Sequence, residues 1–392
     1  MTWIDELVKY SVENVPYYRH RYSGADVAFA ELEVLEKRAV AGREEEFISD
    51  EYAVRDLLFN STSGTTGVPL RRYFRASEAS RTAMPLWRAR RRYGVVDPRL
   101  PSCRFYSDDH GRGRVSSDDH LLSLSVRDLS DSAFAAYHAA MTEHRPVWFQ
   151  VVPSVAGRFS RWMLSHGLSG PSSLRLIELN SEITMPTDRA DIAAAFPSAL
   201  LADHYGSKET WCISYECFRG RRHVLTENMH VEVLTDRGVA STGTGRLVVT
   251  SRHFRTMPLL RYCLGDRVTL SFGQCECGRS GSEVERVDGR ISEYAVGDAG
   301  EPVYQTFFDI GVRRSLSRWP RSIGRYQFHQ IGRTLEVWIE PGERWSAEVA
   351  DSLVHYLQPT FFDSDIRVVP MDIAEIPHRK FRSVISDRDS PI

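Results

Sequence analysis

The sequence contains very little lysine. Only four of its fifty basic residues are lysines, at positions 9, 37, 208 and 380, and arginine supplies all the others. A position that keeps a lysine in such a background is a candidate for a role that needs a primary amine. Codon usage can produce the same bias, so the count needs a second observation beside it.

The chain also lacks any run of about 18 consecutive apolar residues, the length needed to span a bilayer, and its N-terminal segment carries charges throughout. We therefore expect a cytoplasmic protein, monomeric or homodimeric, with no membrane partner. Fifty basic against 52 acidic residues leave a net charge of −2, which gives no electrostatic basis for nucleic-acid binding. A small-molecule ligand remains, and 392 residues suffice for one large domain with a smaller partner.

Cysteine is sparse as well, with six residues in the whole chain. The pair in "CEC" is too close for an easy disulfide, which favours thiols or a metal site over a disulfide framework. Cys217 and His223 lie in "CFRGRRH", and Cys275 and Cys277 lie in "CECGR". Together they make a Cys₃His set suited to a closed, structural Zn²⁺ site. Cys263 is a competing ligand, and ordinary buried thiols are the alternative to a metal site.

The pattern of apolar residues predicts an α/β protein. Between 146 and 205 short apolar runs alternate with helical stretches, which indicates buried strands. From 229 to 272 the sequence is strand-like and predicts an antiparallel or mixed subdomain. A helix is expected over 76–93, with a kink or interruption at Pro85. A boundary near 286–292 precedes a βαβ-like set of elements.

The segment "STSGTTGVPL", residues 61–70, could cradle a polyphosphate. Its glycines let the backbone approach a ligand, and its hydroxyls and backbone N–H groups are donors. A P-loop of the Walker type is excluded, because no lysine follows Gly67. A solvated Ser/Thr/Gly turn is the alternative interpretation of this segment alone.

Four motifs occur in the order typical of the adenylate-forming superfamily, which includes acyl-CoA synthetases, peptide-synthetase adenylation domains and luciferase. "STSGTTGVPL" resembles the phosphate-binding signature of that superfamily, and "DHYGSKE" at 203–209 resembles its adenine-site motif. "RYCLGD" at 261–266 resembles the ribose-binding element, and "GR" at 289–290 resembles the hinge motif. The strings "VPYYRHRY", "MPLLRY" and "CECGR" are similar to phenylacetate-CoA ligase and its capsular-polysaccharide-type relatives.

This resemblance implies an α/β fold class with two domains. The expected domains are a large N-terminal adenylate-forming domain, residues 1–288, with α/β layers and a strand-rich subdomain, and a small mobile α+β C-terminal domain, residues 291–392. The implied reaction is ATP-dependent, AMP-forming activation of an aromatic or small carboxylic acid to an acyl-adenylate, followed by transfer to CoA, an amine or a carrier protein. ATP, Mg²⁺, structural Zn²⁺ and CoA are the implied cofactors. A nucleotide-binding protein without catalysis is the alternative from another class.

The resemblance also implies the site residues. The ATP-binding set is Thr62, Ser63, Gly64, Thr65, Thr66, Gly67, Asp203, His204, Tyr205, Gly206, Asp266 and Arg290, and the catalytic set is Lys208, Glu209 and Lys380. Glu209 is expected to bind Mg²⁺ between phosphate oxygens. Lys380 is expected to reach the substrate carboxylate and the α-phosphate. The alternatives are a turn aspartate for Asp266 and an exposed cation for Lys380.

Three departures from the family pattern stand out. Lys208 occupies the place where threonine is usual, so it could anchor an acidic substrate or contact phosphate. Ser292 and Glu293 follow the hinge motif where an aspartate pair is expected. The loop that follows the hinge in phenylacetate-CoA ligase is replaced by "YAVGDAGEPVYQTFFD", residues 294–309, which weakens the case for CoA as the acceptor.

Overall fold

The computed structural model describes residues 2–22, 27–61, 69–106, 113–290, 293–371 and 384–387. The chain forms two compact units, each made of two separate stretches. Unit 1 combines Met1–Val96 with Ala202–Arg286, and unit 2 combines Asp97–Leu201 with Val287–Ile392. The two domains expected from the sequence, 1–288 and 291–392, stay a prediction.

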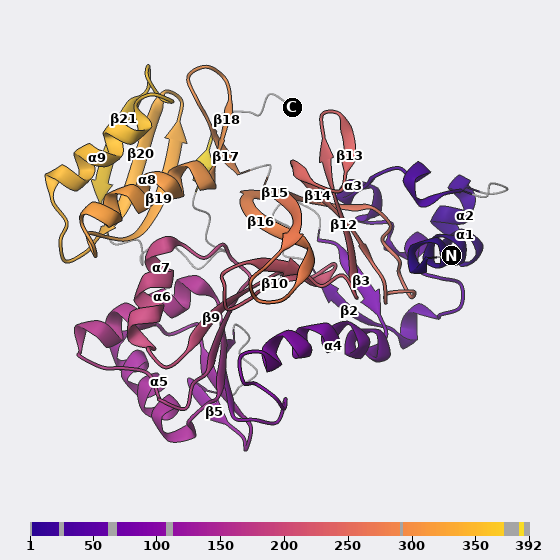
Figure 1. Ribbon diagram of the computed structural model, residues 1–392, viewed down its shortest axis with the longest axis horizontal. Helices are drawn as coiled ribbons and strands as arrows, with labels where there is room; N and C mark the ends of the chain where they lie inside the picture. The colour runs from indigo at the N-terminus through magenta and orange to yellow at the C-terminus, as the bar shows by residue number, and fades with distance from the viewer. Residues whose placement is uncertain are drawn as a thin grey trace. The chain divides into compact units, whose positions relative to one another are not determined.

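Unit 1 is rich in strands, as expected for 229–272 (Figure 1). Its helices are α1 Trp3–Asn14, α2 Pro16–Tyr22, α3 Lys37–Val40 and α4 Ala76–Arg91, with 3₁₀ turns at Phe29–Glu31, Glu44–Phe47 and Val54–Asp56. Its strands are β1 Leu35–Glu36, β2 Leu58–Ser61, β3 Arg71–Phe74, β9 Leu200–Ser207, β10 Trp211–Glu216, β11 Arg222–Val224, β12 Met229–Thr235, β13 Gly238–Ala240, β14 Gly243–Ser251, β15 Tyr262–Gln274 and β16 Ser280–Arg290.

The main sheet of unit 1 runs in the order β13-β12-β14-β15-β16-β11-β10-β9. Antiparallel pairing joins β12 to β14, β14 to β15, β11 to β16, β10 to β11 and β9 to β10. Alternation of side chains explains why these segments form strands, since Val231 and Val233 of β12 are buried while Glu232 between them is only partly buried. The antiparallel subdomain predicted from the sequence is confirmed.

Helix α4 runs from Ala76 to Arg91 without a break, so of the kink or interruption expected at Pro85 the interruption is wrong and the kink stays a prediction. Its N-terminus is secured because the Arg75 N–H donates to the Glu78 carboxylate at 2.9 Å. Pro85 is itself among the buried residues of the helix. Packing of this face against the rest of unit 1 outweighs the loss of one backbone hydrogen bond.

A short N-terminal segment is tied to the strand that carries Asp266. Strand β1 pairs in parallel with β15, with Leu35 opposite Tyr262. Arg261, just before β15, donates from Nη1 to the carbonyl oxygens of Ala30 at 2.9 Å and Leu32 at 2.7 Å. The Leu35 N–H in turn donates to the Arg261 carbonyl at 2.9 Å. These contacts hold the backbone at residues 30, 32 and 35, shortly before α3 begins.

Unit 2 contains the alternating helices and strands predicted between 146 and 205. Its elements are β4 Ser102–Tyr106, β5 Val115–Ser117, β6 Leu121–Ser125, α5 Asp131–His144, β7 Trp148–Val151, α6 Pro153–Ser165, β8 Leu176–Asn180, α7 Pro186–Ala195, β17 Tyr294–Val296, β18 Pro302–Tyr304, α8 Gln305–Arg318, β19 Ile323–Ile331, β20 Thr334–Pro341, α9 Ala347–Leu357, β21 Asp365–Pro370 and β22 Val384–Ser386.

One sheet of unit 2 has the order β8-β7-β4-β6-β5. Strands β8, β7, β4 and β6 are parallel, and β5 pairs with β6 in the antiparallel sense. Phe149, Ile177 and Leu179 from these strands pack with Phe159 of α6 and Ile192 of α7 in one core. Burial of nearly every residue of β8 accounts for the continuous apolar run in its sequence.

The other sheet of unit 2 has the order β21-β20-β19-β22, with α8 and α9 lying beside its strands (Figure 1). The βαβ-like set expected in the last hundred residues is therefore present. Residues 294–309, which replace the expected loop, form the hairpin β17–β18 and the first turn of α8. Within the described ranges, none of the helices combines the length and the apolar character that a membrane crossing requires.

Candidate nucleotide and metal sites

The motif "DHYGSKE" forms the end of β9 and the turn into β10. Gly206 lies opposite Cys212 in this hairpin. A Cβ atom at position 206 would lie 2.1 Å from the carbonyl oxygen of Trp211, which is far inside van der Waals contact. Only glycine fits there, and this requirement explains the glycine of the motif.

We expect Gly206→Ala to lower the free energy of unfolding by about 1–3 kcal/mol, because the backbone of one strand must move to admit the methyl group. Chemical denaturation of the purified protein measures the change. Gly273→Ala is the matched control, since a Cβ there would meet a flexible arginine nitrogen at an ordinary 3.6 Å. Equal destabilisation by the two variants would contradict the close approach at Gly206.

Ser207 fixes the turn that presents Glu209. The Ser207 hydroxyl accepts from the N–H groups of Glu209 and Thr210, both at 3.2 Å, and its oxygen lies 3.0 Å from the Thr210 hydroxyl. This local pattern is the turn chemistry expected of serine. It holds the buried Glu209 at the head of the hairpin while Lys208 beside it is exposed.

The predicted adenine and ribose motifs meet in unit 1. The Tyr205 hydroxyl donates to Asp266 Oδ2 at 2.7 Å, and the Asp266 residue is 8% exposed. Asp203 lies on the same strand, where its side chain is 3.6 Å from Arg222 Nη1 and its N–H donates to Glu216. The ring of His204 lies 6.2 Å from that of Tyr215. The structure thus brings 203–206 and Asp266 together.

Lys208 reaches the strand that leads into the phosphate-loop candidate. Its Nζ donates to the carbonyl oxygen of Ser61 at 2.9 Å, at the last residue of β2. Thr62, Ser63, Gly64, Thr65, Thr66 and Gly67 lie outside the described residues, as does Lys380. Arg290 ends β16, and its carbonyl accepts from the Glu293 N–H at 3.0 Å in unit 2.

Two basic residues that are not in the predicted site sets lie close to Glu209. Lys37 Nζ is 4.0 Å from Glu209 Oε1, and Arg72 Nε donates to the Glu209 carbonyl at 2.9 Å. Arg72 is completely buried, and its guanidinium lies 4.8 Å from the centre of the Phe254 ring. Burial lowers the pKa of Arg72 to about 10, against the raising influence of Glu78. Arg72 therefore remains charged at neutral pH.

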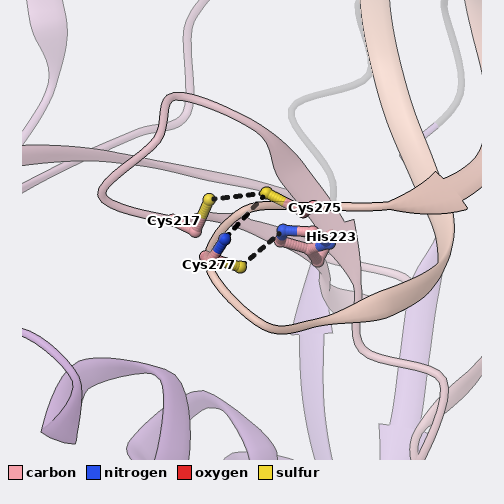
Figure 2. Close-up of side chains that lie close together, drawn as sticks. All are labelled: Cys217, His223, Cys275 and Cys277. Atoms are coloured by element: carbon pink, nitrogen blue, oxygen red, sulfur yellow. Dashed lines mark hydrogen bonds between the residues drawn. The ribbon is translucent and has the colours of Figure 1, made fainter.

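The four predicted metal ligands gather in one place (Figure 2). Their donor atoms all lie within 4.8 Å of one another. Cys217 Sγ is 3.9 Å from Cys275 Sγ, and Cys277 Sγ is 3.3 Å from His223 Nε2. Two sulfur ligands on a tetrahedral Zn²⁺ are about 3.8 Å apart, given bonds of about 2.3 Å. The donor set fits zinc, and Cys263, the competing candidate, is not part of it.

Two similar turns present the three cysteines, strand β11 presents His223, and Figure 2 shows the four side chains facing one another. In each turn a cysteine N–H donates to the carbonyl four residues later, from Cys217 to Arg221 and from Cys275 to Arg279. Gly220 and Gly278 then donate back to the cysteine carbonyls, at 2.8 and 2.9 Å. The signal was available in the sequence as the repeated pattern Cys-x-x-Gly-Arg.

Glu283 lies beside the histidine of this cluster. It lies opposite His223 in the β11–β16 pairing, is 2% exposed, and places Oε1 3.3 Å from His223 Nδ1. Arg221 Nε donates to the other oxygen of Glu283 at 2.7 Å. Burial and the nearby Arg279 lower the pKa of His223 to about 4, so its ring is neutral at pH 7. A carboxylate at Nδ1 leaves Nε2 for a metal, as is usual for histidine ligands.

Comparisons with known proteins agree with the motifs. No protein-family model matches the chain. The chain is 24% identical over 401 residues to the phenylacetate-coenzyme A ligase of Thermus thermophilus, and the match covers 96% of this chain and 85% of that protein. This similarity and the structural likeness below confirm the predicted resemblance to the adenylate-forming superfamily.

Two solved structures illustrate the likeness in fold. One is 2-hydroxyisobutyryl-CoA ligase in the postadenylation state in complex with R3-HIB-AMP, with a TM-score of 0.77, 16% identity, and coverage of 98% of this chain and 88% of that one. The other is benzoate CoA ligase from Burkholderia xenovorans, with a TM-score of 0.55, 12% identity, and coverage of 86% and 69%. They confirm the α/β fold class.

Proposed function

We propose that this chain, which resembles the adenylate-forming superfamily in its motifs and its fold, is an ATP-dependent, AMP-forming ligase that activates a carboxylic acid and passes the acyl group to CoA. The observation that carries this proposal is the hydrogen bond between Tyr205 and Asp266. It joins two motifs that are far apart in the sequence, at the place where an adenosine is expected. Glu209 lies in the turn that follows the strand of Tyr205. CoA is favoured as the acceptor because it is in the names of the relatives.

The proposed reaction has two steps. A carboxylate oxygen of the acid attacks the α-phosphorus of ATP, so that a bond forms to that oxygen and the bond from the α-phosphorus to the β-phosphate bridge breaks. Pyrophosphate leaves, and an acyl-adenylate remains. The CoA thiol then attacks the acyl carbon, loses its proton and displaces AMP. Activation helps because AMP is a much better leaving group than oxide, and most of the catalysis is positioning and charge stabilisation.

Each residue of the site has a proposed role in the first step. Asp266, oriented by Tyr205, accepts hydrogen bonds from the ribose hydroxyls. Glu209 holds Mg²⁺, which when bound neutralises charge on the phosphate oxygens. Lys208, already at the end of β2, contacts the phosphates that the loop 62–67 holds. Lys380 stabilises the charge that develops between the carboxylate and the α-phosphate.

The Cys₃His cluster is proposed to hold one structural Zn²⁺. Four protein ligands close a tetrahedral site and leave no position for a substrate. The ion would join the β10–β11 turn to the β15–β16 turn, and β10 and β15 lead from the adenine and ribose motifs. Because ATP and CoA are supplied in the cytoplasm, we propose that the enzyme acts there, as a monomer or homodimer.

Exchange of labelled pyrophosphate into ATP tests the first step. The purified protein is incubated with Mg²⁺, ATP, pyrophosphate and one acid at a time from a panel of aromatic and small carboxylic acids. Exchange that depends on one class of acid is the expected result. A folded protein that binds ATP but supports no exchange with any acid would favour a nucleotide-binding role without catalysis.

The acceptor needs its own experiment, because residues 294–309 differ from the loop of the CoA ligases. Acid, ATP and enzyme are combined with CoA, with a primary amine, or with a phosphopantetheinylated carrier protein, and the products are identified by mass spectrometry. An acyl-CoA thioester is the expected product. An amide or an acylated carrier, with no thioester, would replace CoA in the proposal and leave the adenylation step intact.

A further inference from the structure

Lys37 lies at a position whose preceding backbone is held by several contacts. It is the first residue of α3 and directly follows β1, which is paired with the strand that carries Asp266. Arg261 fixes the preceding backbone through the carbonyls of Ala30 and Leu32. The side chain is 26% exposed. The backbone at Lys37 is therefore fixed relative to β15, and its side chain starts from a defined position.

The carboxylate nearest to the Lys37 ammonium group belongs to Glu209, the residue proposed to hold Mg²⁺. Lys37 Nζ lies 4.0 Å from Glu209 Oε1, which is longer than a direct hydrogen bond. An ammonium group and Mg²⁺ beside the same carboxylate repel one another unless further negative charge lies among them. A polyphosphate supplies that charge, since its oxygens can accept from the lysine and bind the metal at the same time.

A second cation, Arg72, lies close to Glu209. Arg72 is fully buried there, and its Nη1 and Nη2 have no hydrogen-bond partner among the described residues. Glu78, the other carboxylate close to Arg72, already accepts from the N–H groups of Arg75 and Thr256. Lys208 adds a third cation at the entry to the phosphate-loop candidate. Such an arrangement favours a ligand with several negative charges.

The choice of lysine adds a second observation from the sequence. Lys9, Lys37 and Lys208 are the lysines within the described residues, and Lys37 is the one whose Nζ lies 4.0 Å from the Glu209 carboxylate. Lys208 precedes Glu209 in the chain, and its Nζ donates to the Ser61 carbonyl. Lys9 pairs with Glu13 on the exposed surface of α1 at 3.9 Å. Because arginine supplies nearly all the other basic residues of this chain, a lysine at position 37 is a candidate for a role that uses a compact ammonium group.

We propose that Lys37 binds the β- and γ-phosphates of ATP and remains in contact with pyrophosphate as it leaves. The inference rests on the proposed adenylation reaction and adds to it a cation from the N-terminal segment. The ammonium group donates to non-bridging phosphate oxygens. It therefore stabilises the negative charge that the pyrophosphate gains when its bond to the α-phosphorus breaks.

Binding of AMP, Mg²⁺-ATP and Mg²⁺-pyrophosphate to three variants tests this role by calorimetry. Lys37→Met is expected to weaken ATP and pyrophosphate binding by about 10-fold or more, the usual effect of losing a charged hydrogen bond. AMP, which lacks the β- and γ-phosphates, should bind within about twofold of the wild type. Lys37→Arg keeps the charge but not the compact ammonium group, so its ATP affinity should lie between those of the wild type and Lys37→Met, and Lys9→Met should change nothing.

Exchange kinetics give a second readout. In Lys37→Met the KM for pyrophosphate should rise about 10-fold, and thermal unfolding should match the wild type within a few degrees. Equal weakening of AMP and ATP would make Lys37 merely structural and overturn the inference, as would ATP and pyrophosphate binding equal to the wild type. If the wild type exchanges pyrophosphate and Lys37→Met does so with the same kinetics, only this inference is overturned. A wild type without ATP binding or exchange overturns the proposed function as well.

Discussion

Replacing Glu209 by glutamine is expected to lower the rate of ATP–pyrophosphate exchange by about 10²–10³-fold, the usual cost of removing one group that stabilises transition-state charge. Glutamine has the same size and can keep the turn set by Ser207. It lacks the negative charge that Mg²⁺ requires of an oxygen ligand at this position. Half-saturation by Mg²⁺ should therefore move to a concentration about tenfold higher.

The fold should tolerate this change. Glu209 pairs with Lys37, whose side chain is 26% exposed and can be hydrated once the carboxylate is gone. We expect the free energy of unfolding to change by no more than about 1 kcal/mol. The matched control is Glu13→Gln, which removes the carboxylate from a lysine–glutamate pair of nearly the same length, 3.9 Å, on the surface of α1. If Glu209→Gln exchanged pyrophosphate as fast as Glu13→Gln does, Glu209 would have no part in the reaction.

Loss of the metal ligands is expected to have the largest effect on stability. Protein purified without chelators should contain about one equivalent of zinc, and Cys275→Ser should contain less than about a tenth. The substitution breaks the link between the two turns of Figure 2. We expect the free energy of unfolding to fall by more than the roughly 1–3 kcal/mol expected for Gly206→Ala, because a structural zinc ion contributes directly to folding.

Cys263→Ser separates the metal effect from the general effect of replacing a buried thiol. Cys263 is 2% exposed and Cys275 is 3% exposed, so the two positions bury the new hydroxyl equally. Zinc content should be unchanged in Cys263→Ser, and the loss of stability should be smaller. The cluster would be ordinary buried thiols if the wild-type protein contained less than about a tenth of an equivalent of zinc, or if the two serine variants behaved alike.

Local chemistry explains why so much of the site could be predicted. Gly206 and Ser207 are required by the hairpin they form, and their roles depend on neighbours within six residues. The cysteines and the histidine follow from the ligand preference of zinc. The alternation of apolar and polar residues predicts the antiparallel strands between 229 and 272, because one face of each strand must be buried. Each of these features depends on residue types within short segments, so it can be predicted without knowledge of the rest of the chain.

Predictions were less successful where long-range packing competes with a local rule. Pro85 should interrupt a helix in isolation, yet α4 is continuous, since its buried face packs within unit 1. The sequence predicts only that residues 294–309 replace the loop of the phenylacetate-CoA ligases. In the structure they form a hairpin and the start of α8. The roles of Lys380 and of residues 62–67 stay predictions, because these residues lie outside the described part of the chain.

The fold class, the nucleotide motifs and the four candidate metal ligands could be predicted from residue type, spacing and apolar pattern alone, and the structure brings the four candidate ligands together. Only the tertiary structure decided which groups surround Glu209. Lys37 and Arg72 come from separate segments, and Glu283 meets His223 through a strand pairing. The β1–β15 pairing places the segment of Lys37, and the β11–β16 pairing places Glu283 opposite His223. The register of both pairings is set by burial across the whole sheet.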